Sequence, residues 1–293
     1  MKQKDYRIAL LNTWIEKSSQ RRKVINWGVY VALSLAAILA LIPLISVFSF
    51  VTFRGFSALD WDFFISLPKP VGEIGGGIAN ALVGTAILVG FGTLIGLPWG
   101  FGIGIYLSEY GASKRASAIR FTVDLLASIP SIVIGLFVYA AVVVPMKRFS
   151  AYAGGIALGI LMVPTVARST EEILKLVPIH IREAGLALGL PRWKVILRII
   201  FRGSLGALIT GVMLSVARVS GETAPLLFTA LSNRFWSHRL DQPIASLPVQ
   251  IYNYAISPYD DWHRQAWGAA LVLIFFVLFL NLTTRWAMKK GTK

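Results

Sequence analysis

An arginine and a glutamate lie inside a long apolar segment of this 293-residue chain. Arg218 falls near the centre of residues 203–231, and Glu222 follows four residues later. An arginine in membrane hydrocarbon costs on the order of 3 kcal/mol by insertion scales, so it normally faces a wet cavity or a charged partner. On one helix, a spacing of four places both side chains on one face and predicts a pair. Such a pair either fixes its helix to the neighbouring helices or serves a polar path.

Two further side chains could act at the same place. Arg168 follows Pro164 at the end of another apolar segment, where a long basic side chain either reaches the lipid headgroups or faces a polar path. Thr223 offers a hydroxyl directly beside Glu222. Asp124, near the end of a third apolar segment, is expected to meet a basic neighbour or cytoplasmic water.

The elements that must position these residues are membrane-spanning helices. Hydrophobic residues make up 56% of the chain and charged residues only 15%, against about 45–50% and about 25% in soluble domains. A helix needs about 20 apolar residues to cross the hydrocarbon. The sequence therefore predicts an all-α, polytopic membrane protein with about six spans, at residues 27–51, 78–107, 121–144, 152–167, 203–231 and 267–284.

The basic residues predict the orientation of these spans. With the N-terminus inside, the cytoplasmic segments carry 21 Lys and Arg and the outside loops carry seven. This is the positive-inside pattern, and it places both termini in the cytoplasm. It also accounts for the net charge of +15 without a nucleic-acid partner. We expect a cytoplasmic segment at 1–26, a single transmembrane domain at 27–284 and a cytoplasmic tail at 285–293.

Glycines recur every fourth residue in the second predicted span. Gly92, Gly96, Gly100 and Gly104 share one helical face. Small residues allow helices to approach closely in a membrane, where apolar lipid removes the hydrophobic incentive to associate. The stripe predicts a packing face for a neighbouring helix, with a pore-lining face as the alternative.

No motif for catalysis occurs in the chain. The phosphate-binding sequence G-x-x-x-x-G-K-[ST] is absent, as are zinc-protease and serine-nucleophile motifs. The chain has no cysteine, and its three histidines are far apart, so neither a metal site nor a cofactor site is predicted. An enzyme is therefore not expected, which leaves a transporter, a channel or a scaffold.

The predicted cytoplasmic loop at about 171–203 contains the most informative sequence. Glu183 opens a short amphipathic stretch, and Gly189 can adopt the positive φ that ends a helix. Pro191 suits the first turn of a following helix. The pattern predicts a short helix, a turn and a second helix, which would also fit an ordinary interfacial basic loop.

This loop resembles the "EAA" loop of binding-protein-dependent ABC importer permeases. Glu183, Ala184 and Gly189 match the family pattern, and Ile199 matches its distal hydrophobic position. Two features depart from it: Gly185 replaces the second alanine, and Phe201-Arg202 stand where Leu-Pro is usual. In that family the loop is a coupling helix that seats on the ATPase subunit. The resemblance assigns that role to Glu183, Ala184, Gly185, Leu188 and Gly189.

Three other segments extend the resemblance over most of the chain. Residues 164–173, 217–231 and 247–258 are similar to phosphate-specific permeases of the PstA type. The resemblance implies the type I ABC importer permease (MetI-like) fold and a place in the bacterial inner membrane. It also implies as partners a homologous second permease, two ATP-binding cassette subunits that hold ATP and Mg, and an external phosphate-binding protein.

Within that family, Arg218 is expected to line an anion path and Glu222 to tune or gate it, because a guanidinium matches phosphate oxygens bidentately. Arg168 and Thr223 are the further candidates for the path. The alternatives are a permease for another anion, such as sulfate or molybdate, and an ion-coupled secondary transporter.

Overall fold

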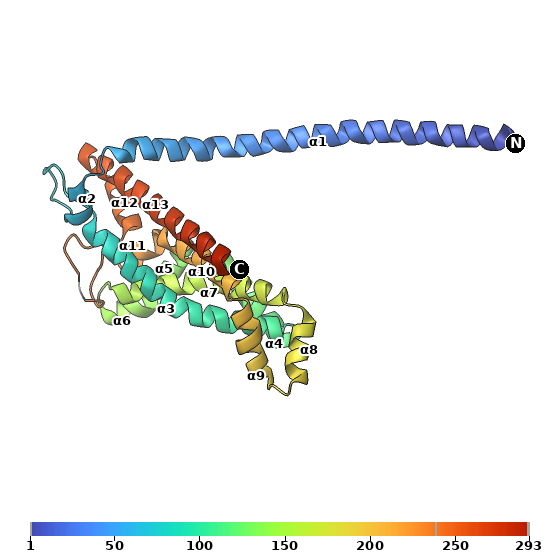
Figure 1. Ribbon diagram of the computed structural model, residues 1–293. Coiled ribbons are helices and arrows are strands. Elements are labelled where there is room, and N and C mark those ends of the chain that lie inside the picture. Colours follow the sequence, from blue (N-terminus) through green and yellow to red (C-terminus); the bar gives the residue numbers. More distant parts are fainter. Residues whose placement is uncertain (1, 238, 292–293) are drawn as a thin grey trace. The chain divides into compact units, whose positions relative to one another are not determined.

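The computed structural model describes residues 2–237 and 239–291, so Met1 and residues 292–293 of the predicted terminal segments lie outside it. The chain forms two compact units, one up to Phe53 and one from Arg54 onward (Figure 1). The described residues form helices and one isolated antiparallel bridge between Pro68 and Gly76. The helices are α1 (Lys2–Phe56), α2 (Trp61–Ile65), α3 (Ala79–Glu109), α4 (Lys114–Ser128), α5 (Ser131–Val138), α6 (Val144–Met146), α7 (Ala151–Lys175), α8 (Ile179–Ala187), α9 (Arg192–Lys194), α10 (Leu205–Ser220), α11 (Ala224–Thr229), α12 (Leu247–Ala255) and α13 (Asp260–Gly291), with π-helical turns η1 (Tyr139–Val143) and η2 (Val195–Phe201).

Four of these helices are long and apolar enough to cross a membrane. They cover 25–56, 79–109, 151–175 and 260–283, and two bent helix pairs raise the number to as many as six. The predicted spans at 27–51, 78–107, 152–167 and 267–284 are confirmed by α1, α3, α7 and α13. The helix at 152–167 continues past Arg168 to Lys175.

The third predicted span is not one straight helix. Residues 114–128 and 131–146 meet at an angle of 100°. Pro130 causes the break, because it has no N–H to donate to the preceding turn and it drives Ile129 into an extended conformation with ψ of 130°. The predicted span at 121–144 is therefore a bent helix pair, which counts among the six spans if the two halves cross the membrane together.

The fifth predicted span is also interrupted. α10 ends at Ser220, Gly221 caps it, and α11 begins at Ala224 with Pro225 in its first turn. Glycine is a weak helix former, and Pro225 has no backbone N–H to donate to the carbonyl of the preceding turn. Both residues therefore disfavour a continuous helix. A second bend, of 73°, separates residues 192–201 from α10.

α3 and α7 pack along the predicted glycine stripe. A Cβ built on Gly92, Gly96 or Gly100 would lie 2.9, 2.7 and 2.6 Å from the Cβ of Leu158, Met162 and Val166, respectively. Gly104 stands in the same relation to Thr170, at 2.5 Å. Real side-chain carbons do not approach this closely, so the two backbones touch only because these residues are glycine. The packing interpretation of the stripe is confirmed.

Two buried clusters connect this helix pair to the rest of the second unit. One joins α3 and α7 to α10, α11 and α12 through Leu88, Leu158, Met162, Val219 and Leu226 among others. The other lies where the α8–η2 segment meets α3 and α7, and its buried members are Leu174, Val195, Ile200 and Leu208. α8 and α9 project together at one end of the second unit, and α2 lies at the other end (Figure 1).

Candidate functional site

Arg218 lies in the last turn of α10, immediately before the helix breaks. Its side chain is exposed on the surface of the chain, and no ion-pair partner for it exists among the described residues. Because an unpaired guanidinium is costly against lipid, this face of α10 must meet water or another protein subunit.

The predicted pair between Arg218 and Glu222 does not form within the described part of the chain. A shared helical face requires α-helix from one residue to the other, and α10 ends at Ser220. The prediction that Glu222 lies one turn further along the same helix is therefore wrong. Glu222 and Thr223 instead occupy the non-helical link between α10 and α11, where both are partly exposed. The break leaves Arg218 and these two side chains close together along the chain, but not paired.

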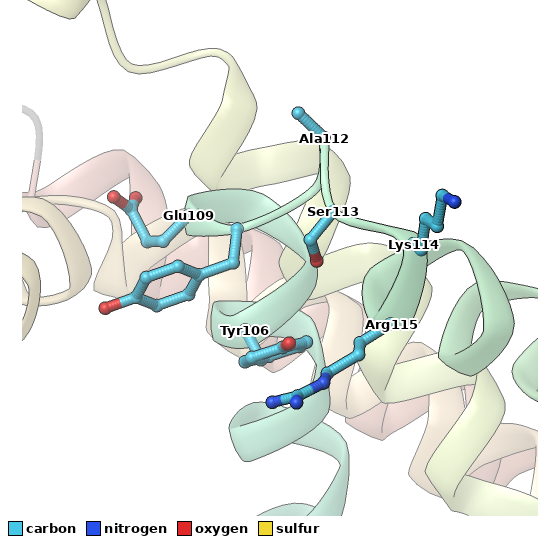
Figure 2. A pocket seen from close by; sticks show the side chains of 7 residues that line it. Tyr106, Glu109, Ala112, Ser113, Lys114 and Arg115 are labelled. Atoms are coloured by element: carbon cyan, nitrogen blue, oxygen red, sulfur yellow. The ribbon is translucent and has the colours of Figure 1, made fainter.

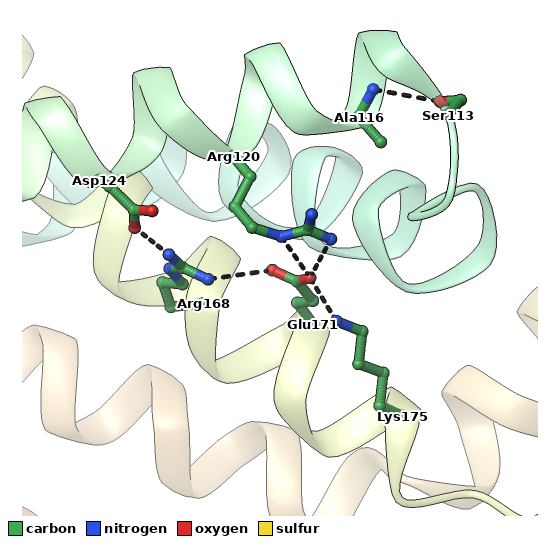
Figure 3. Close-up of polar contacts among 7 residues, drawn as sticks. All are labelled: Ser113, Ala116, Arg120, Asp124, Arg168, Glu171 and Lys175. Carbon is green, nitrogen blue, oxygen red and sulfur yellow. Dashed lines mark hydrogen bonds and ion pairs between the residues drawn. The ribbon is translucent and has the colours of Figure 1, made fainter.

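Arg168 is held by two carboxylates. It pairs with Asp124 on α4, and its Nη1 lies 3.5 Å from Oε2 of Glu171, one turn along α7 (Figure 3). The expected basic neighbour of Asp124 is thus Arg168. These pairs tie α4 to α7, so the structure brings Arg168 into a cluster of charges rather than to Arg218.

Glu171 is the centre of that cluster, and no role was predicted for it from the sequence. Its side chain is 1% exposed, and its Oε1 accepts hydrogen bonds from Arg120 Nη2 at 2.7 Å and from Lys175 Nζ at 2.6 Å. A buried carboxylate is stable only when it is paired and hydrogen-bonded in this way. The spacing of four between Glu171 and Lys175 could have revealed one contact, whereas Arg120 is 51 residues away in sequence.

The predicted helix–turn–helix of the cytoplasmic loop is present. α8 ends at Ala187, Gly189 has φ of +77°, and helical residues resume directly after Pro191. Gly185 is buried against η2, and a Cβ there would lie 2.9 Å from Val195 Cγ2 and 3.2 Å from Ile199 Cδ1. Glycine replaces the second alanine of the family pattern where α8 packs closely on the next helix.

The outward face of α8 carries apolar side chains. Ile179 on α8 is more than half exposed, Leu188 directly after the helix is 79% exposed, and Trp193 on the neighbouring α9 is also more than half exposed. Glu183 and Ala184 are exposed on the same helix. An apolar surface of this kind, with a polar edge, is typical of a protein–protein contact.

Arg182 fixes α8 to the ends of two long helices. Its guanidinium lies 3.1 Å from Glu109 Oε1 at the end of α3, and it donates to the carbonyl oxygens of Leu174 and Val177 at 2.9 and 2.6 Å. Leu174 lies in the last turn of α7 and Val177 lies just past the helix end, where a cation is favourable to the helix dipole. The side chains of Arg182 and Glu109 are 17% and 5% exposed. The orientation of α8 is thus set by buried polar contacts.

A pocket of about 570 Å³ lies at the turn from α3 to α4, and Glu109, the ion-pair partner of Arg182, is one of its lining residues. Figure 2 shows lining side chains that include Tyr106, Lys114 and Arg115. Tyr110 also lines the pocket. The guanidinium of Arg192 lies 5.3 Å from the ring centre of Tyr110, so α9 touches the rim of the pocket. The loop and this turn together form one basic, aromatic surface.

The chain is similar to known membrane transport proteins. Residues 100–290 match the family described as "binding-protein-dependent transport system inner membrane component". The chain is 48% identical to a phosphate transport system permease protein PstA of Yersinia pestis, over 81% of each chain. It is 51% identical to that of Haemophilus influenzae, over 79% of this chain and 82% of the relative, and 43% identical to that of Xylella fastidiosa, over 91% and 93%.

Solved structures show the same fold. The chain is similar to an inward-facing MetNI methionine ABC transporter, with a TM-score of 0.60 and 18% identity over 74% of this chain and 95% of that one. An amino acid ABC transporter structure matches with a TM-score of 0.54 and 14% identity, over 73% and 92%. These likenesses confirm the predicted fold of type I importer permeases.

Proposed function

This chain belongs to the family of inner membrane components of binding-protein-dependent transport systems, and we propose that it is a permease subunit of an ATP-driven phosphate importer. The relatives that are 43–51% identical to it over most of their length are phosphate transport permeases. The chain contributes half of the translocation path and, having no nucleotide motif, leaves ATP and Mg to its partner ATPases. Both termini lie in the cytoplasm.

The observation that carries the path assignment is the contrast between Arg218 and Arg168. Arg168 is neutralised by Asp124 and Glu171, whereas Arg218 is exposed at a helix break without an ion-pair partner in the described residues. A guanidinium retained without a carboxylate is available to bind an anion bidentately. Glu222 and Thr223, in the non-helical link beyond it, can move relative to Arg218 and adjust its hold on the anion. Arg168 has a structural role instead.

The exposed face of α8 is the proposed contact with an ATPase subunit. Ile179 on α8 and Leu188 directly after it supply the apolar surface, and Glu183 supplies an exposed carboxylate beside Ala184. Arg182 passes any displacement of α8 to α3 and α7 through its contacts with Glu109 and the end of α7. A homologous second permease completes the path, and an external phosphate-binding protein delivers the anion.

The test is phosphate uptake by proteoliposomes that hold the assembled complex, with ATP supplied on the side of the ATPases. Arg218→Gln should abolish uptake while the subunit still inserts and copurifies with its partners. The matched control is Arg148→Gln, because Arg148 is a half-exposed loop arginine that pairs with Asp241 at 3.0 Å. It should retain uptake.

Three results would contradict the proposal. Normal uptake by Arg218→Gln at normal protein level removes Arg218 from the path. Uptake of sulfate or molybdate in place of phosphate assigns another anion. Uptake that needs an ion gradient and no ATP replaces the importer with a secondary transporter.

A further inference from the structure

A second polar pocket lies at the other end of the second unit from α8, and Arg218 is not among its lining residues. It has a volume of about 140 Å³ and is formed by the start of α3, the loop after α11, α12 and the start of α13. The residues on which the argument rests are Asn80, Asn233, Arg234, Gln250, Tyr254 and Trp262. The positive-inside pattern places these segments outside the cytoplasm. The space equals that of roughly four or five water molecules at about 30 Å³ each, which suits a small ion.

Two buried amides in the pocket have their donors engaged and their oxygens free. Asn80 Nδ2 donates to the carbonyl of Asn233 at 2.6 Å, and Gln250 Nε2 donates to the carbonyl of Gly77 at 3.4 Å. These bonds set the orientation of both amides. Asn80 Oδ1 and Gln250 Oε1 then have no hydrogen-bond partner in the described part of the chain, although the residues are only 4% and 5% exposed. A buried acceptor without a donor is unfavourable, so these oxygens favour a ligand that donates.

One cation accompanies these acceptors. The guanidinium of Arg234 lies 5.2 Å from the ring centre of Trp262, which in turn stacks on Tyr254 at 4.6 Å. No carboxylate pairs with Arg234 among residues 2–237 and 239–291. The nearby carboxylate of Asp261 is engaged with Arg264, Gln265 and the backbone N–H of Gly75.

Tyr254 adds a donor to the same wall. Burial raises the pKa of its phenol, while the nearby Arg234 and a hydrogen bond with the side chain of Gln250 act in the opposite direction. The phenol therefore keeps its proton at neutral pH. The pocket thus offers a guanidinium and a phenol as donors, and two amide oxygens as acceptors.

We infer that this pocket is an outer binding site for inorganic phosphate, at which the anion is held and selected before it reaches Arg218. The inference rests on the proposed function for the identity of the substrate. Phosphate at neutral pH carries both P–O⁻ groups, which suit Arg234, and P–O–H groups, which suit Asn80 Oδ1 and Gln250 Oε1. Sulfate at this pH carries no hydroxyl, and the phosphodiester of a phospholipid headgroup carries none either. Sites that bind a hydroxyl of the ligand discriminate strongly against analogues without one.

The experiment measures equilibrium binding of radiolabelled phosphate to the assembled complex in nanodiscs, without ATP and without the binding protein. All variants are made in an Arg218→Gln background, so the path site does not contribute. We expect saturable binding that arsenate displaces and sulfate does not. Arg234→Gln should weaken binding at least about tenfold, in line with the loss of one charge-assisted bond. Arg239→Gln is the matched control, because Arg239 is an exposed loop arginine bound to Asp241, and it should bind normally.

A second variant tests selectivity without removing the charge. Gln250→Met keeps the length of the side chain and removes the acceptor, so it should narrow the preference for phosphate over sulfate by about tenfold. Binding that Arg234→Gln leaves unchanged, or that sulfate displaces as well as arsenate does, overturns the site. The proposed function is judged separately, by ATP-dependent uptake in the complex with native Arg218. Vesicles of anionic lipid that displace the label would assign the pocket to a lipid headgroup and overturn the inference.

Discussion

A substitution in the glycine stripe should separate α3 from α7. In Gly100→Leu the new Cβ would lie 2.6 Å from both Cβ and Cγ1 of Val166. Carbon atoms in contact are about 3.5–4.0 Å apart, so the helices must part by roughly 1 Å, a gap that forfeits a quarter to a half of the contact energy along the seam. Overpacking of this kind typically costs about 1–3 kcal/mol, and we expect the upper end because both sides of the contact are close to backbone.

The chain offers a matched control two residues away. Gly102 lies on the same helix, is exposed, and has no atom within 4 Å of a built Cβ. Gly102→Leu therefore adds the same side chain to the same helix without touching α7, and its stability should change by no more than about 0.5 kcal/mol.

The assay is the midpoint of thermal unfolding of the purified complex in detergent, followed by size-exclusion chromatography after heating. At about 2–4 °C for each kcal/mol, Gly100→Leu should lower the midpoint by roughly 6–12 °C, and Gly102→Leu should leave it within about 2 °C. Equal shifts for both variants would show that glycine matters for the helix itself and not for the α3–α7 contact. An unchanged midpoint for Gly100→Leu would refute the packing argument.

Two buried charges should also matter for stability. Glu171→Gln should destabilise the complex by about 2–3 kcal/mol, somewhat below the usual cost of breaking a buried ion pair because Arg120 and Lys175 are partly exposed; a thermal midpoint equal to that of the native complex would contradict this. Arg182→Ala should cost about 3–5 kcal/mol because it leaves Glu109 buried without its partner. The substitution should also release α8, which limited proteolysis would detect as new cleavage between α7 and α9. An unchanged cleavage pattern would contradict the role of Arg182 in holding α8.

Features that depend on local spacing could be predicted from the sequence. The glycine stripe has a period of four residues, which is a property of one helix, and its packing role was confirmed. The turn at Gly189 was equally local, because positive φ is a preference of that single residue. Long apolar segments also revealed four spans directly.

Features that depend on several distant segments could not be predicted in the same way. A proline such as Pro130 interrupts a helix, but a bend of 100° depends on what the two halves pack against. The pairing of Arg218 with Glu222 assumed an unbroken helix, and Gly221 with Pro225 interrupt it. The burial of Glu171 requires Arg120 from another helix, and no periodic pattern connects residues 51 positions apart.

The glycine stripe of α3 is synthesised well before the helix that packs on it. The contact face of α3 is complete at Glu109, but its partner α7 is complete only at Lys175. At about 5–20 residues per second, translation leaves α3 in the bilayer for roughly 3–13 s before α7 can cover it. During that interval its flat backbone face can associate with any other helix that presents small residues, including one from a neighbouring nascent chain. The intervening α4–α6 segment therefore has a kinetic task in addition to its structural one, since a short connection keeps α7 close to α3 and favours the pairing within one chain.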